Sequence, residues 1–185
     1  MALEATFRSL RTCLHKVDDV MHALHITMEE PEHDQAAVAD DLTDKTLELL
    51  GTVHEAQSAA ESALKALGDP PSMDLARRSL AACQERFHRI EQRFSADLAS
   101  YKTLAELVRV AGRSKQWAAW ANSATRGVED CRQPLEQASE ALAACWQELA
   151  EHTGSTSVSV RTTSIGQRIV AKPSEANDLG YERIT

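Results

Sequence analysis

Residues 3–28 read LEATFRSLRTCLHKVDDVMHALHITM, and their apolar side chains recur in alternating steps of three and four residues. An average spacing near 3.5 residues places such side chains on one stripe of an α-helix, as in coiled coils and helical bundles. The stretch therefore predicts a long amphipathic helix that packs its stripe against other helices. The ladder consists of Leu3, Phe7, Leu10, Leu14, Val17, Met21, Leu24 and Met28.

Three further ladders with the same spacing follow, over residues 39–67, 73–108 and 117–149. Proline and glycine residues lie between them, at Pro31, at 68–71 and at Gly112, and these residues end helices. Because the connections are short, neighbouring helices are expected to run antiparallel. The sequence predicts an all-α fold, in which residues 1–152 form an up-down-up-down four-helix bundle with long heptad-patterned helices.

Pro134 falls inside the fourth ladder. Proline removes a backbone donor from a helix and clashes with the preceding turn, so a kink is expected near 130–131. The ladder keeps its phase across Pro134, which favours one kinked helix over residues 115–152. Two separate helices are the alternative.

Residues 153–185 have no helical ladder and are rich in serine and threonine. Residues 157–160 alternate Ser and Val as a strand does, Ile165-Gly166 can turn the chain, and residues 169–170 can form a second short strand. A lone hairpin is marginal in water. We therefore predict a non-helical C-terminal tail that is flexible or ordered by a partner. Its candidate partner-binding residues are Val158, Val160, Ile165, Ile169 and Tyr181.

The 185-residue chain carries a formal net charge of −8. This charge argues against binding to nucleic acid or to an anionic membrane surface, both of which favour basic proteins. The sequence contains no apolar run of 18 residues or more, and its start lacks the apolar region of a secretory signal. The four cysteines fall on or beside the ladders, where we expect free buried thiols. These features predict a cytoplasmic location.

The acidic charge is concentrated in residues 29–67, which carry ten acids and two lysines. The third ladder carries three arginines that share one face at helical spacing. Acids beside arginines would ease the packing of the two helices; alternatively, one of these faces binds a partner. The charged partner-binding candidates are Asp40, Asp41, Asp44, Glu48, Arg86, Arg89 and Arg93.

Two residues, Trp120 and Asp97, depart from the apolar pattern of the ladders. Trp120 lies one step off the fourth ladder, which predicts a place at the seam or the flank of the bundle. Tryptophan is enriched among binding hot spots, so Trp120 is a further partner-binding candidate, with closure of the bundle end as the alternative. Asp97 is the one charged residue on a ladder, and we expect it to be paired with an arginine or partly exposed.

A di-iron site in a helical bundle needs Glu-x-x-His pairs that point into the bundle. Residues 85–88 and 19–22 have an acid and a histidine at this spacing, but the ladder phase turns both pairs outward. Glycine-rich phosphate loops, Cys-x-x-Cys and nucleophile elbows are absent from the sequence. We therefore predict no catalytic residue, no metal ligand and no cofactor.

These observations favour a non-enzymatic protein–protein interaction module, a scaffold or adaptor with a helical body and a docking tail. A protein partner or self-association is expected. One alternative is an acidic, immunity- or antitoxin-like protein that neutralises a basic target through residues 34–67. Another is a homo-oligomeric assembly protein.

Overall fold

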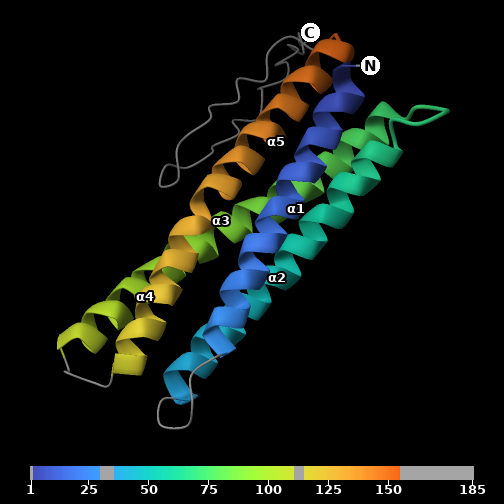
Figure 1. The fold of residues 1–185 in the computed structure, drawn as a ribbon. Helices are drawn as coiled ribbons and strands as arrows, with labels where there is room; N and C mark the ends of the chain where they lie inside the picture. Colours follow the sequence, from blue (N-terminus) through green and yellow to red (C-terminus); the bar gives the residue numbers. More distant parts are fainter. Residues whose placement is uncertain (1, 30–35, 111–114, 155–185) are drawn as a thin grey trace, which may run out of the picture.

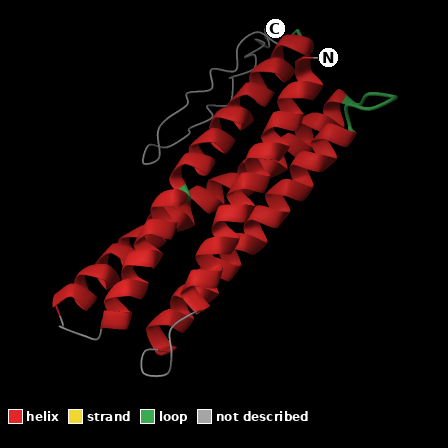
Figure 2. Ribbon diagram, viewed as in Figure 1, coloured by secondary structure: helices red, strands yellow, loops and turns green. Residues whose placement is uncertain are grey.

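The computed structural model describes residues 2–29, 36–110 and 115–154. They form the helices α1 (Ala2–Glu29), α2 (Ala36–Lys65), α3 (Met73–Val110), α4 (Lys115–Asp130) and α5 (Arg132–His152). Within this described part of the chain there is no strand, so the predicted all-helical body is confirmed (Figure 2). The hairpin expected between 157 and 170 lies outside the described residues.

The helices lie side by side along one long direction (Figure 1). Helix α1 packs on α2 along one flank and on α4 and α5 along the other, while α2 packs most extensively on α3. Contacts between α1 and α2 join Asp18 to His54 and Leu14 to Gln57, so ascending positions on one helix meet descending positions on the other. Helices α3 and α5 approach each other far less than α2 and α3 do.

The core is built from the apolar ladders. All eight ladder residues of α1 are buried, and Thr46 of the second ladder is buried with its hydroxyl donating to the Leu42 carbonyl at 2.7 Å. A helical threonine can satisfy its hydroxyl in this way. Leu50, which is off the second ladder, is also buried. Helix α2 therefore buries a stripe slightly wider than its ladder alone.

The fourth predicted helix is divided at Cys131 into α4 and α5. Cys131 keeps helical dihedral angles, and its N–H donates to the Gly127 carbonyl at 3.3 Å while its carbonyl accepts from the Leu135 N–H at 3.2 Å. Pro134 has no N–H to offer the Asp130 carbonyl, which accounts for the discontinuity at the predicted place. Because Val128 and Leu135 are both buried, the apolar face continues across it.

Trp120 lies in the seam between α4 and α1, one of the two places that its position beside the ladder predicts. Its side chain is 8 % exposed, and its indole N–H donates to the Thr27 carbonyl at 2.8 Å. Trp120 is one position off the ladder, but its large indole reaches the end of α1. Trp120 consequently offers little surface to a partner.

Candidate functional site

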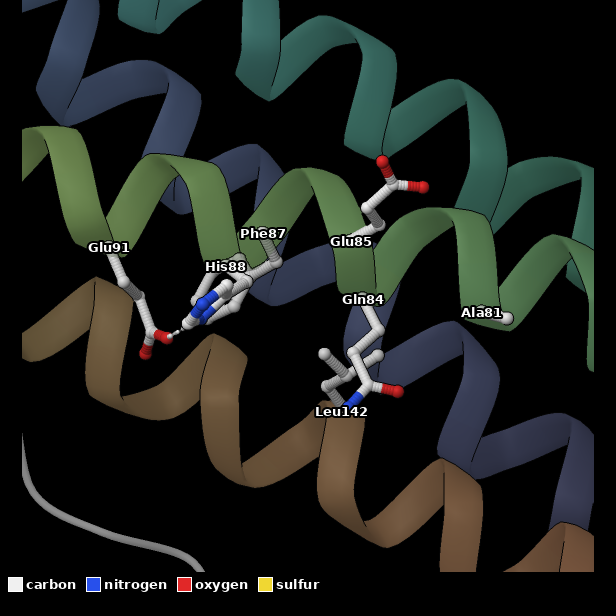
Figure 3. Close-up of a pocket in the computed structure, with 7 residues that line it drawn as sticks. All are labelled: Ala81, Gln84, Glu85, Phe87, His88, Glu91 and Leu142. Carbon is white, nitrogen blue, oxygen red and sulfur yellow. Dashed lines mark ion pairs between the residues drawn. The ribbon is translucent and has the colours of Figure 1, made fainter. Parts of the chain in front are cut away.

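A groove between α3 and α5 contains a pocket (Figure 3). The pocket has a volume of about 280 Å³. Phe87 and Leu142 supply apolar surface from opposite helices, while polar side chains of α3 stand around it. Its lining consists of Ala81, Gln84, Glu85, Phe87, His88, Glu91 and Leu142.

The groove exists because each of its two helices packs mainly on another neighbour. Helix α3 packs mainly on α2 and helix α5 mainly on α1, so α3 and α5 approach each other at few places. Ala81 has too short a side chain to fill that space, and it is exposed. Glu85 points away from Leu142 in Figure 3, so its side chain does not fill that side of the pocket.

The polar rim is organised around His88. Its Nδ1 lies 4.0 Å from Glu91 Oε2, and its Nε2 lies 2.8 Å from the amide nitrogen of Gln92. If the Gln92 amide donates, His88 accepts at Nε2 and carries its ring hydrogen at Nδ1, toward Glu91. Burial raises the pKa of Glu91, and the nearby Ser139 hydroxyl opposes this shift.

This order of residues suits binding better than hydrolysis. A catalytic triad needs a histidine between the serine and the carboxylate, where it can take the serine proton. Here the two ring nitrogens of His88 lie near Glu91 and Gln92. The groove instead offers an apolar floor beside a carboxylate, which fits an apolar side chain accompanied by a cation.

Several charged candidates on α2 and α3 are held in ion pairs, and the partner of Arg89, Glu85, also lines the groove. Arg93 Nη1 lies 2.6 Å from Glu48 Oε2, and Arg86 Nε lies 3.2 Å from Glu55 Oε2. Arg89 pairs with Glu85 on its own helix. The acids of α2 therefore do lie beside the arginines of α3.

The remaining candidates are not brought to the groove. Asp41 pairs with Lys45 at 2.7 Å, and Asp44 is exposed on α2. The side chain of Asp40 and the whole of the tail candidates lie outside the described residues. Those tail candidates are Val158, Val160, Ile165, Ile169 and Tyr181.

Asp97 is partly buried at the α2–α3 seam. Burial raises the pKa of its carboxyl; Lys45 and Arg93 lower it, while Asp41 and Glu48 add to the rise. Asp97 is thus partly exposed and close to cations, as its ladder position predicts.

The raised pKa of Asp97 sets the pH dependence of a substitution. A carboxyl whose pKa is raised by folding stabilises the protein at low pH, and that contribution is lost as the pH rises through the folded pKa. Asp97→Asn is therefore expected to raise the free energy of unfolding at pH 7 and to change it little below pH 3.8, the ordinary pKa of the group. Urea unfolding at both pH values checks this. The control Asp44→Asn, at an exposed position, should change neither value.

Sequence reasoning missed the groove and the burial of Ser139, which is 7 % exposed. Ser139 follows the ladder residue Ala138 directly, so its place at the edge of the stripe was visible. The distance between α3 and α5 was not visible, because a ladder gives the buried face of a helix and not its separation from each neighbour. The outward direction expected for Asp19, His22 and Glu85 is confirmed, since all three are exposed, whereas His88 is half-buried at the pocket between α3 and α5.

Comparison with protein-family models, with curated proteins and with solved structures found no match to this chain. Across the described residues, no helix combines the length and apolar character needed to cross a membrane. In the same residues, no group of three or more histidine, cysteine or acidic side chains is arranged to hold a metal ion.

Proposed function

We propose that this chain is a non-enzymatic protein-interaction module. Its body is a rigid up-down-up-down bundle with heptad-patterned seams, and residues 153–185 carry the element that docks on a protein partner. The observation that carries the proposal is the position of the tail's first residue. Arg77 Nη2 of α3 donates to Thr153 Oγ1 at 3.1 Å, so the tail leaves the body at a fixed point beside the α3–α5 groove.

The register of the polar contacts supports the topology. Glu55 pairs with Arg86 and Glu48 with Arg93. Seven residues toward the N-terminus of α2 therefore correspond to seven residues toward the C-terminus of α3. This is the register of antiparallel helices. The extensive burial of ladder residues supports a stiff body that can hold a docking segment in place.

The expected partner is a protein, with no role for nucleic acid or a membrane. The net charge of −8 supports this choice, because nucleic acids and anionic lipid surfaces attract basic proteins. A cytoplasmic location completes the proposal. It suits the four cysteines, which are free in the structure and would stay reduced there.

Affinity capture from native extract tests the proposal. The bait is the intact chain or a chain that ends at His152, and bound proteins are identified by mass spectrometry and quantified. We expect a stoichiometric partner with the intact chain and its loss with the shortened chain. Equal capture by both baits would overturn the role of the tail.

A second candidate function is neutralisation of a basic target by α2. The observation that favours it is the exposure of Asp41 and Asp44 near the start of the helix, away from the arginines that engage Glu48 and Glu55. The same capture experiment includes a bait with Asp40, Asp41 and Asp44 changed to lysine. Loss of the partner with this bait, and retention with the shortened chain, would favour this second function.

A further inference from the structure

We propose that residues 155–172 dock in the α3–α5 groove of their own chain. This inference rests on the proposed function, because it makes the groove a resting place for the docking segment until a partner displaces it. The groove is open, its walls are defined, and the chain leaves the body at its end. Three observations identify the occupant: where the segment starts, how far it reaches and what charge it carries.

The segment starts at the end of the groove. Thr153 is tied to Arg77 of α3, and Gly154 follows with a φ of +63°. A glycine in the left-handed region after the last helical turn ends a helix and redirects the chain. The next residues can therefore turn back along the seam between α3 and α5.

The pocket lies within reach of the first few residues of the segment. From Arg77 to His88 the rise along α3 is about 16 Å, at 1.5 Å per residue. An extended chain covers about 3.3 Å per residue, so roughly five residues after Gly154 span that length. Val158 and Val160 consequently come level with Phe87 and Leu142.

The side chains of the segment match the groove. In an extended chain Val158 and Val160 share one face, while Ser157 and Ser159 face the opposite way. Phe87 and Leu142 are buried and add little exposed surface to the pocket, so two valines there would pack mainly beside the exposed Ala81. Packing against the helices would also support the hairpin that this segment can form, which is marginal alone.

Charge favours the same occupant. Residues 155–172 contain no acid and three bases, Arg161, Arg168 and Lys172. Helix α5 carries four glutamates against one arginine, and Glu91 of α3 stands at the rim of the pocket. A basic segment is attracted to this seam, and the attraction should weaken as salt screens it.

Limited trypsin digestion of the intact chain tests the inference. Trypsin cleaves after Arg161 and Arg168 in the segment and after Arg183 near the end of the chain, and cleavage after Arg183 serves as the internal reference. Ala81→Arg places a bulky cation at an exposed position in the groove. We expect cleavage after Arg161, relative to Arg183, to be about tenfold faster in this variant than in the natural chain, because proteolysis follows the population of the open segment.

Two controls keep the test decisive. Ser62→Arg adds the same side chain at an exposed position of α2, in a shallow depression between α2 and α3, and should leave the cleavage ratio unchanged. The double variant Val158→Ser/Val160→Ser alters only the segment, so it leaves the helical body intact, and it should accelerate cleavage as Ala81→Arg does. Equal cleavage ratios in the natural chain and in both groove-disrupting variants would overturn the inference.

Dilution distinguishes docking within one chain from docking of the tail on a second copy. Docking within one chain gives a cleavage ratio that is independent of protein concentration. A ratio that rises on dilution would assign the groove to the tail of another copy and overturn docking within the chain. Failure here is distinct from failure of the proposed function: partner capture that depends on the tail can persist when the segment is unprotected, and protection can persist when no partner is captured.

Discussion

Phe87→Ala is expected to lower the free energy of unfolding by about 3–5 kcal/mol, the range for removing a buried aromatic side chain. Phe87 is 1 % exposed and reaches from α3 into the shared core, while one edge of its ring lines the groove. The substitution removes the ring from both the core and the groove. The surrounding helices are held by contacts with other neighbours, so they cannot close fully on the space.

Urea unfolding followed by far-ultraviolet circular dichroism measures this loss. Phe87→Leu is the matched control, since it keeps most of the apolar volume and should cost about 1.5 kcal/mol or less. A loss below about 1 kcal/mol for Phe87→Ala would contradict the position of the ring in the core, because buried Phe-to-Ala changes cost several times that value.

Gly127→Leu is expected to destabilise the protein by about 1–3 kcal/mol, because it overpacks the contact between α4 and α1. A Cβ atom at Gly127 would lie 2.9 Å from Leu24 Cδ1 and 3.9 Å from Leu24 Cα. Leu24 is 1 % exposed, so its side chain has little room to withdraw. Glycine at position 127 therefore allows the two helices to approach closely.

A double variant tests the contact directly. Leu24→Ala alone leaves a cavity, but Leu24→Ala combined with Gly127→Leu refills the same space, so the two losses should be less than additive. Gly51→Leu is the control, because nothing lies within 4 Å of a Cβ atom there. It should stabilise α2 by up to about 1 kcal/mol through helix propensity. Fully additive losses in the double variant would contradict the close approach of Gly127 to Leu24.

The buried faces of the helices were predictable, because a ladder records which side of a helix meets the core. Val17, Val53, Leu80 and Val128 were each placed on a ladder, and each is fully buried. The discontinuity near Cys131 was predictable for a similar reason, since the missing donor of Pro134 acts within one turn of helix. Both effects depend on residues that are close together in the chain, so the sequence alone predicts them.

The groove was not predictable, because it depends on how far apart two helices settle. Ladder residues of α3 such as Ile90 are buried, but the ladder does not predict which helices they contact. Glu91, one residue later, can face solvent or a seam, and only the packing of α5 decides that it is partly buried.

The central claim is that the tail binds the partner while the helical body holds the tail in place. Isothermal titration of the captured, purified partner into the intact chain and into the chain that ends at His152 tests this most directly. We predict that the shortened chain loses about tenfold or more in affinity, which corresponds to at least about 1.4 kcal/mol of binding free energy. Equal affinity for the two chains would contradict the claim and would place the binding surface on the helices.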